Sequence, residues 1–326
     1  MKCAGCYKEN TGGYCNKCRK KLFDGKQVST VLPFSAPKNE NLRQYHEQAK
    51  RLSISGVQLK YSLRLEGKIL TLSDGNGQYI LKPVPPAPSL AYAEAAPENE
   101  HLTMQIAEQV FGIQTAANAL VYFEDGLPAY VTRRFDVKAD GSKRLQEDMA
   151  QLSGKTKSTH GESYKYSGTY EDIGVLIKRY VAAAMPALEI FFRNVLFNYV
   201  ISNGDAHLKN FSLMQMDAGD YTLTPAYDLM STILHVPGET DTALDLFEGD
   251  INTEYYSTYG HHGYPDFMEL AKRLSLVENR AKRIVADMVS KVDAVLAMID
   301  ASPLPDELKA AYKHYYIDKV KRITIA

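Results

Sequence analysis

The sequence lacks several features that would assign it to a protein class at once. Tryptophan is absent, and no apolar run approaches the roughly 18–20 residues that a membrane-spanning helix needs. The N-terminal stretch M-K-C-A-G-C-Y-K-E-N has no apolar core of the kind found in secretory signal peptides. The net charge of −1 gives the chain no general attraction to nucleic acid or to an acidic membrane. We therefore expect a cytoplasmic protein without a membrane partner.

Charge is nevertheless distributed unevenly along the chain. Residues 1–60 hold 12 Lys+Arg against 4 Asp+Glu, whereas the remaining residues hold 26 against 35. A basic end of this size could meet an acidic partner or nucleic acid, but such an excess is more often solvated surface. We therefore do not expect direct binding of nucleic acid.

Cysteine is also scarce, but all four cysteines lie within the first 18 residues. They form two Cys-x-x-Cys pairs separated by eight residues: Cys3, Cys6, Cys15 and Cys18. In a reducing compartment, this spacing predicts four thiolates around one structural metal ion, with Zn²⁺ favoured and iron as the main competitor. Catalysis is not expected there, because four thiolates leave the ion no open position. Two disulfides or uncommitted thiols are the alternatives, and the expected cytoplasmic location argues against the disulfides.

The remaining pattern predicts an α+β chain, with a mixed half followed by a helical half. Strand-like alternation begins near residue 52 and recurs at 119–123 and 128–135, and a helix is expected at 99–110. Further helices are expected at 170–183, 187–201, 266–274, 277–299 and 305–323. We therefore expect a metal-binding module at 1–25, a linker at 26–50, an N-terminal lobe at 51–140 and a helical C-terminal lobe at 141–326.

The most informative stretch is N-G-D-A-H-L-K-N, residues 203–210, which is followed by a strand signal and by T-P-A-Y-D-L-M-S, residues 224–231. Asp205 and Asn210 have the Asp-x-x-x-x-Asn separation of a kinase catalytic loop, and Asp228 follows where a second metal-binding carboxylate is expected. Asp205 would orient an acceptor hydroxyl and take its proton. The oxygens of Asn210 and Asp228 are hard ligands suited to Mg²⁺. The alternative is that these residues cap neighbouring helices.

The N-terminal lobe offers weaker signals for nucleotide binding. Residues 53–60, S-I-S-G-V-Q-L-K, lie between strand signals, where small residues let backbone N–H groups approach phosphates. Lys82, on a later strand, would contact the α- and β-phosphates, although a strand lysine is otherwise a surface residue. Glu100, on the next helix, could pair with Lys82 or remain an exposed carboxylate.

Seven segments, taken in order, resemble the HipA family of serine/threonine kinases. They are S-I-S-G-V-Q-L-K, I-L-K-P, E-N-E-H-L, R-R-F-D, E-D-M-A-Q, N-G-D-A-H-L-K-N-F-S and P-A-Y-D-L-M-S, between residues of about 52 and 300. The resemblance implies a bilobal protein-kinase-like fold, with a mixed β/α N-lobe and an all-helical C-lobe. It also implies an ATP- and Mg²⁺-dependent toxin of a toxin–antitoxin system, because members of this family phosphorylate aminoacyl-tRNA synthetases and halt translation.

The resemblance also carries site residues over to this chain. Asp205 resembles the catalytic base, and Asn210 and Asp228 resemble the pair that holds Mg²⁺. The nucleotide-binding positions that it implies are Ser55, Gly56, Val57, Gln58, Leu59, Lys60, Lys82, Glu100, Arg133, Arg134, Phe135, His207, Leu208, Lys209, Asn210, Tyr227 and Asp228. A loop serine is autophosphorylated in this family, and Ser53 and Ser55 are the candidates here. A phosphate on either serine would carry about −1.5 to −2 charges and repel the phosphates of ATP.

Three departures from the family pattern limit what the resemblance implies. Arg133 stands where the adenine-contacting hinge usually begins with Glu. The chain has the short cysteine segment in place of an extra N-terminal subdomain, as in the HipT-type toxins, whose missing subdomain is a separate antitoxin. A HipS-like antitoxin, a HipB-like DNA-binding protein or both are therefore expected partners. The family has no general requirement for four cysteines. A small-molecule kinase and a non-catalytic partner-binding protein remain the alternative functions.

Overall fold

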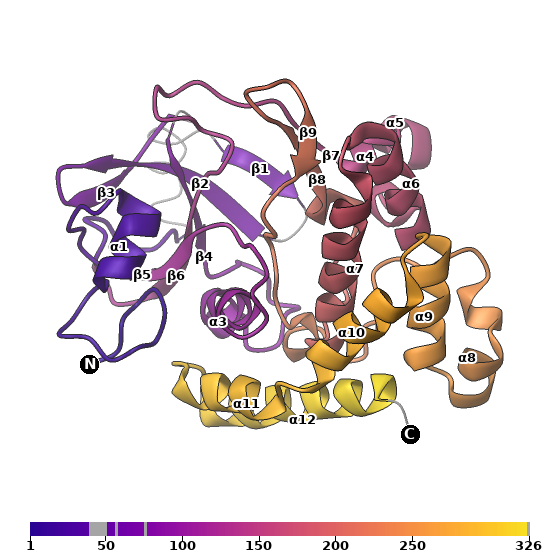
Figure 1. Cartoon of the computed structure of the whole chain (residues 1–326). Coiled ribbons are helices and arrows are strands. Elements are labelled where there is room, and N and C mark those ends of the chain that lie inside the picture. The colour runs from indigo at the N-terminus through magenta and orange to yellow at the C-terminus, as the bar shows by residue number, and fades with distance from the viewer. Residues whose placement is uncertain (39–50, 56–57, 75–76, 325–326) are drawn as a thin grey trace. The chain divides into compact units, whose positions relative to one another are not determined.

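The computed structural model describes residues 1–38, 51–55, 58–74 and 77–324, and for residues 51–55 and 58 it describes the backbone alone (Figure 1). The chain forms two compact units. Unit 1 contains residues 1–105, 116–143 and 298–306, and unit 2 contains residues 106–115, 144–297 and 307–326. Each unit is built from different elements, a sheet in unit 1 and mainly helices in unit 2.

Unit 1 contains a sheet in which all the neighbouring strands run antiparallel, in the order β1-β2-β4-β6-β5, with β3 paired to β2. The strands are β1 (Arg51–Ser55), β2 (Gln58–Glu66), β3 (Ile69–Leu72), β4 (Tyr79–Pro83), β5 (Asn118–Tyr122) and β6 (Pro128–Arg133). Lys82 pairs with Tyr130 across β4 and β6, and Leu81 pairs with Val131. Because side chains alternate along a strand, Lys82 and Tyr130 lie on one face and Leu81 and Val131 on the other.

The N-terminal segment packs against the face of the sheet that carries Leu81 and Val131. Helix α1 (Asn16–Phe23) buries Leu22 and Phe23 in one hydrophobic core with both of these strand residues, and Cys3, Cys6 and Cys18 belong to the same core. The Tyr14 hydroxyl donates to the Leu120 carbonyl oxygen at 2.8 Å.

Residues 26–38, the described part of the predicted linker, contribute Val28, Leu32 and Ala36 to this core. The segment also continues the contacts of the sheet, because Val31 and Tyr122 form a parallel bridge. The cysteine segment and the sheet therefore share one core, and the predicted divisions at residues 25 and 50 fall inside unit 1.

Helix α3 (Ala96–Gln109) follows a short 3₁₀ turn at Ala93–Ala95 and corresponds to the helix predicted at 99–110. Leu102 and Ile106 are fully buried, as expected for the apolar face. Three consecutive polar side chains, Asn99, Glu100 and His101, are also buried. Buried polar groups need partners, so these positions mark where α3 makes specific contacts.

Unit 2 is mainly helical. Its helices are α4 (Met149–Leu152), α5 (Lys157–His160), α6 (Tyr170–Tyr180), α7 (Ala184–Val200), α8 (Glu254–Tyr259), α9 (Tyr264–Arg273) and α10 (Glu278–Val289). Most of α12 (Asp306–Ile323) and the first part of α11 (Val292–Ala301) belong to it as well. Close packing requires a glycine in α6, because a Cβ on Gly174 would lie 2.1 Å from the Leu274 side chain.

Two details of the helical lobe differ from the prediction. The lobe is not all helical, because the short strands β7 (Gln146–Asp148), β8 (Ser212–Gln215) and β9 (Tyr221–Leu223) form a sheet. The strand signal predicted between residues 210 and 224 falls where β8 and β9 lie, whereas β7, with three residues, is too short to show a clear alternation in the sequence. The helix predicted at 277–299 is two helices, α10 and α11. The Ser290 hydroxyl donates to the Asp287 carbonyl oxygen at the break, a local bond that competes with helix continuation.

None of the helices in the described part of the chain is both long and apolar enough to cross a membrane.

Candidate functional site

Lys82 and Glu100 form a buried ion pair within unit 1. Lys82 Nζ donates to Glu100 Oε1 at 2.5 Å, and the two side chains are only 4% and 1% exposed. Lys82 Nζ also lies 5.4 Å from the centre of the Tyr130 ring. The sequence left two alternatives for Glu100, this contact or an exposed carboxylate, and the structure shows the contact. A buried ion pair contributes little stability relative to apolar residues of similar size, so this pair is a candidate for a functional role.

The other predicted nucleotide positions of unit 1 lie on the β1–β2 hairpin and at the end of β6. Ser53 pairs with Lys60 and Ser55 with Gln58 across the hairpin, whereas Gly56 and Val57 lie outside the described residues. Leu59 packs against the core of the unit.

Arg133, the first predicted hinge residue, makes a bidentate contact with Asp24 at the C-terminal cap of α1. Its two terminal nitrogens donate to the Asp24 carboxylate at 2.6 and 2.9 Å. Arg134 also makes a bidentate contact, through Nε and Nη2, with the carboxylate of Asp136, and Phe135 lies between these two residues in the chain. The Arg133 side chain therefore tethers α1 to the sheet. This contact fits the departure noted in the sequence, where Arg133 stands in place of the usual Glu of the hinge.

In unit 2, hydrogen bonds and packed aromatic rings fix the backbone of the loop after α7. Asn203 bridges the loop, because its Nδ2 donates to Asn198 Oδ1 at 2.7 Å and its Oδ1 accepts from the Asp205 amide at 3.2 Å. The Tyr170 hydroxyl donates to the Ala206 carbonyl oxygen at 3.0 Å. The Tyr170, Phe191 and Phe211 rings pack against one another, with centroids 5.3–6.3 Å apart. The loop backbone is therefore held in place by contacts within unit 2.

The carboxylate of Asp205 is half-exposed, with 49% of the side chain accessible. The Tyr166 hydroxyl donates to its Oδ1 at 2.5 Å. Lys165 Nζ and His207 Nε2 each lie 3.9 Å from the same oxygen. Burial lowers the pKa of His207 to about 4, so this imidazole is neutral at pH 7, and Lys165 is the cation beside the carboxylate among the described residues. Asp205 thus combines access to solvent with a fixed orientation.

Asn210 and Asp228 line one small pocket together with Asn194, Asn198 and Tyr227. Asn210 Oδ1 accepts the His207 backbone N–H at 3.2 Å. Asp228 has φ +55°, a left-handed conformation that Asp and Asn tolerate better than most residues. Asn194 Oδ1 is buried and has no hydrogen-bond partner within the described part of the chain. The pocket therefore gathers hard oxygen atoms of the kind that Mg²⁺ prefers.

The remaining predicted residues of this loop mainly support it. Leu208 is buried, and Lys209 Nζ lies 3.3 Å from an oxygen of Asp148. The Tyr227 hydroxyl donates to the Lys209 carbonyl oxygen at 2.9 Å. His207 Nδ1 is buried and lacks a hydrogen-bond partner among the residues that the structure describes, so it is available to an incoming group.

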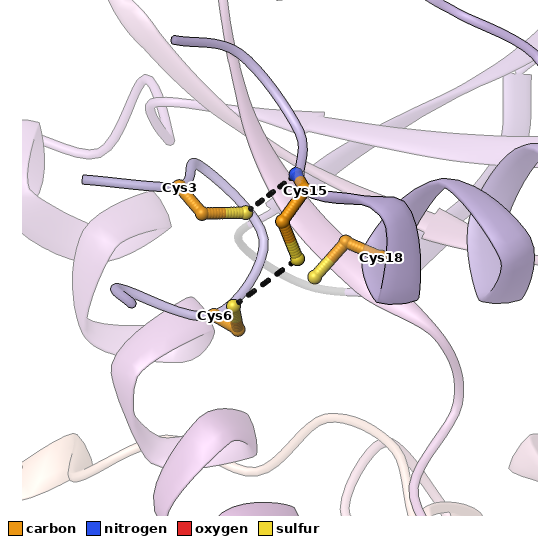
Figure 2. Close-up of side chains that lie close together, drawn as sticks. All are labelled: Cys3, Cys6, Cys15 and Cys18. Atoms are coloured by element: carbon orange, nitrogen blue, oxygen red, sulfur yellow. Dashed lines mark hydrogen bonds between the residues drawn. The ribbon is translucent and has the colours of Figure 1, made fainter. Parts of the chain in front are cut away.

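The four cysteines form a cluster at the other candidate site (Figure 2). Their sulfur atoms all lie within 4.8 Å of one another, and three of the four residues are buried. Cys18 is on α1, and the others are on the preceding loops. Cys3 Sγ accepts backbone N–H groups from Cys15 at 3.1 Å and from Gly5 at 3.4 Å. Such donors stabilise metal-bound thiolates.

The acidity of the thiols also fits a bound cation. Hydrogen bonds from Cys18 and Cys6 hold the pKa of Cys3 well below its usual range, whereas the neighbouring Cys3 and Cys6 raise the pKa of Cys18. One thiolate is therefore favoured and a second is opposed, unless a cation offsets their repulsion. The Cys6 and Cys15 sulfurs are 3.7 Å apart, far longer than the roughly 2.05 Å of a disulfide bond.

The cysteine segment also contacts α3 next to the buried ion pair. A hydrogen bond of 2.7 Å joins the Tyr7 hydroxyl to Nδ1 of His101, the residue that follows Glu100. His101 is fully buried, and burial lowers its pKa to about 3, so the imidazole is neutral. The Tyr7 and His101 rings meet edge to face at 4.9 Å. Two adjacent residues of α3 therefore make the two contacts: Glu100 pairs with Lys82, and His101 contacts the cysteine segment.

Sequence reasoning missed Tyr166, Lys165, Tyr7, His101 and Asp24. Each acts through a contact between residues far apart in the chain, such as the 39 positions between Tyr166 and Asp205 or the 94 between Tyr7 and His101. One signal was available, because Lys165 and Tyr166 follow a polar loop that has no other obvious role.

Comparison with known proteins places these features in context. The family model of the HipA-like C-terminal domain matches residues 52–296. A putative kinase of Haemophilus influenzae is 27% identical over 91% of this chain and 88% of its own length. A putative kinase of Sinorhizobium fredii is 35% identical over 61% of this chain, but only 49% of its own length is matched. The serine/threonine-protein kinase toxin HipA of Shewanella oneidensis is 28% identical over 82% of this chain and 61% of its own length.

Two solved structures share the fold. HipA of Shewanella oneidensis, in a complex with HipB and operator DNA, aligns with a TM-score of 0.61 at 23% identity, over 90% of this chain and 72% of that one. The proinflammatory kinase CtkA of Helicobacter pylori aligns with a TM-score of 0.51 at 12% identity, over 82% of this chain and 90% of that one. The predicted kinase-like architecture is therefore confirmed.

Proposed function

The chain belongs to the HipA-like C-terminal domain family, and from this premise we propose that it is an ATP- and Mg²⁺-dependent protein serine/threonine kinase. The observation that carries the proposal is the loop of unit 2. There, a half-exposed, oriented Asp205 is followed by Asn210 and Asp228, which line one pocket. Phosphoryl transfer needs these groups, because its catalysis consists mainly of positioning and of charge neutralisation.

In the proposed reaction, Asp205 accepts the proton of the acceptor hydroxyl. The hydroxyl oxygen then bonds to the γ-phosphorus of ATP, and the bond between that phosphorus and the departing ADP oxygen breaks. Bound Mg²⁺ would neutralise charge on the phosphate oxygens. Asn210 and Asp228 would hold the ion, and the unpartnered Asn194 oxygen in the same pocket supports a site for a hard cation. Lys82, held by Glu100, would contact the α- and β-phosphates.

The remaining nucleotide contacts and the regulation are proposals that rest on the family resemblance. The β1–β2 hairpin, including Ser55 and Lys60, would cover the phosphates, and His207 Nδ1 would donate to or accept from the nucleotide. Phosphorylation of Ser53 or Ser55 would weaken ATP binding, because it places negative charge beside the ATP phosphates.

The substrate and partner classes follow from the relatives. We propose a protein substrate in translation, such as an aminoacyl-tRNA synthetase, and a separately encoded antitoxin that is HipS-like, HipB-like or both. The Shewanella relative was solved with HipB and DNA, which supports an antitoxin of the second kind.

For the cysteine cluster we propose one structural Zn²⁺, bound by Cys3, Cys6, Cys15 and Cys18. Four buried or partly buried sulfur atoms within 4.8 Å of one another support a closed tetrahedral site. Because these residues share the core of the sheet, the ion would stabilise unit 1 as a whole.

Labelled ATP with Mg²⁺ provides the direct test of the kinase proposal. We expect wild-type protein to incorporate label on Ser53 or Ser55, mapped by mass spectrometry, and Asp205→Asn to lower the rate by at least about 10³-fold. Asp228→Asn keeps a residue that tolerates φ +55°, and should weaken Mg²⁺-dependent ATP binding without unfolding the protein.

The matched control is Asp217→Asn, because this carboxylate of unit 2 is 66% exposed, pairs with Arg144 and has no role in the proposed reaction. Its rate should equal that of the wild type. Label in no protein, with no binding of ATP, would reject the kinase proposal in favour of a partner-binding protein. Phosphorylation of small molecules, with no protein acceptor, would reject the protein substrate alone.

A further inference from the structure

Tyr166 is the closest neighbour of Asp205 that has no assigned role. It ends the 3₁₀ turn Tyr164–Tyr166, and its hydroxyl donates to Oδ1 of Asp205 at 2.5 Å. Its ring meets the buried His207 ring edge to face, with centroids 5.2 Å apart, and Lys165 Nζ lies 4.8 Å from the Tyr166 ring centre. The hydroxyl is therefore held against the carboxylate by contacts on the ring as well as by its own hydrogen bond.

The two oxygens of Asp205 have different surroundings. Oδ1 accepts the Tyr166 hydroxyl and is also the oxygen nearest to Lys165 and to His207. Oδ2 receives no hydrogen bond within the described part of the chain. A carboxylate can rotate about its Cβ–Cγ bond, so anchoring one oxygen decides which of the two is presented to solvent.

The bond affects both partners. Burial raises the pKa of the Tyr166 hydroxyl, and the hydrogen bond and negative charge of Asp205 raise it further. Tyr166 therefore remains a protonated donor across the working pH range, as a fixed hydrogen bond to a carboxylate requires. It is not a second base.

A different role would be occlusion, with the Tyr166 hydroxyl taking the place of the acceptor. The geometry favours orientation instead, because Tyr166 occupies only the oxygen that already faces Lys165 and His207 and leaves the other oxygen available. A side chain that blocked the acceptor would be expected to engage both oxygens.

We propose that Tyr166 is a positioning residue, whose hydroxyl anchors Oδ1 of Asp205 and leaves Oδ2 to receive the proton of the acceptor hydroxyl. The inference rests on the proposed kinase function and deepens it. In the transfer step, the acceptor oxygen bonds to the γ-phosphorus, the bond to the ADP oxygen breaks, and the acceptor proton moves to Oδ2. Tyr166 keeps its own proton throughout.

The first experiment measures autophosphorylation of the full chain with labelled ATP and Mg²⁺. Tyr166→Phe removes the hydroxyl and keeps the ring contact with His207. We expect its maximal rate to fall about tenfold, since it loses one hydrogen bond to a charged group, while the ATP concentration at half-maximal rate stays unchanged. Tyr180→Phe is the matched control, because this partly exposed tyrosine ends α6, and its rate should equal that of the wild type.

A second experiment needs neither nucleotide nor metal. Carboxyl-¹³C aspartate labelling gives an Asp205 signal, which is assigned by its absence in Asp205→Asn. We expect this signal to shift in Tyr166→Phe and to stay in place in Tyr180→Phe. Conversely, the ring carbon bonded to the Tyr166 hydroxyl should shift in Asp205→Asn.

The outcomes separate the inference from the proposed function. A shifted Asp205 signal with a reduced maximal rate supports the positioning role. An active wild type with an equal or faster Tyr166→Phe overturns it, and a faster variant would indicate occlusion. If the wild type shows no transfer at all, the kinase proposal fails, and an unshifted Asp205 signal would then also reject the contact on which the inference depends.

Discussion

The cysteine cluster and the Asp205 loop both gather atoms that bind metals, but their surroundings are opposite. The cluster has four sulfur ligands within 4.8 Å, mostly buried, and rests on the core of a sheet. The loop offers oxygen ligands from two segments, Asn210 and Asp228, and its carboxylate at Asp205 is half-exposed. A closed site holds an ion for stability, and an open one leaves positions for a substrate. The contrast therefore supports the proposed structural role of the first site and the proposed catalytic role of the second.

The largest expected effect breaks the closed site. Cys15→Ser combined with Cys18→Ser removes two sulfur ligands and should release the metal, lowering the stability of unit 1 by several kcal/mol or more. Metal analysis should give one zinc ion per wild-type chain and almost none in the variant, and thermal unfolding should show a large drop in midpoint.

The catalytic variant Asp205→Asn provides the control for this prediction. It should keep its zinc and its unfolding midpoint while losing activity. A cysteine variant that lacks metal but melts like the wild type would show that the cluster is not structural.

An intermediate effect on stability is expected at the buried Lys82–Glu100 pair, whose variants also test its proposed role in ATP binding. Lys82→Met leaves Glu100 buried without its cation, and Glu100→Leu leaves Lys82 without its anion, so each should cost about 3–5 kcal/mol. The double variant should recover most of this stability, because apolar residues pack in place of the pair. Urea unfolding measures the stability, and calorimetry measures ATP binding.

ATP binding by the double variant decides the role of the pair. If the pair is kept for function, the double variant is stable and binds ATP weakly. A stable double variant that binds ATP like the wild type would remove Lys82 from the proposed phosphate site.

The smallest expected effect is a pH dependence beside the open site. Glu239 accepts hydrogen bonds from the Thr232 hydroxyl at 2.5 Å and from the Gly204 amide at 3.4 Å, and burial raises its pKa to about 7. Because the folded protein holds this proton more tightly than the unfolded chain, stability falls as pH rises from about 4.5 to about 7. The loss is at most about 3 kcal/mol.

Glu239→Gln keeps the size and the acceptor oxygen but does not titrate. Its free energy of unfolding, measured in denaturant between pH 4 and pH 8, should lack the decline seen in the wild type. Parallel curves for the two proteins would contradict the raised pKa.

Much of the fold could be predicted, because many helices and strands show local hydrophobic periodicity in the sequence. Helix α7 and strands β5 and β6 have clear periodicity, and the predicted spans agree with the observed ones to within a few residues. The break at Ser290 and the three-residue strand β7 could not be predicted, because each depends on single hydrogen bonds or on pairing with a distant strand.

The candidate site divides in the same way. Asp205, Asn210 and Asp228, like the four cysteines, could be identified from their spacing in the sequence. The contacts that orient these groups could not be identified in that way. Tyr166 reaches Asp205, and Arg133 reaches Asp24, only after the chain has folded, so no pattern near either residue announces the partner.

The shared core of unit 1 has a consequence for how this chain can be cut. The family match begins at residue 52, yet Leu22 and Phe23 pack with Leu81 and Val131 of the sheet. A fragment that starts at the family boundary would turn this face of the sheet toward water and would be prone to aggregate. The cysteine segment is therefore separable as a stretch of sequence but not as a folding unit.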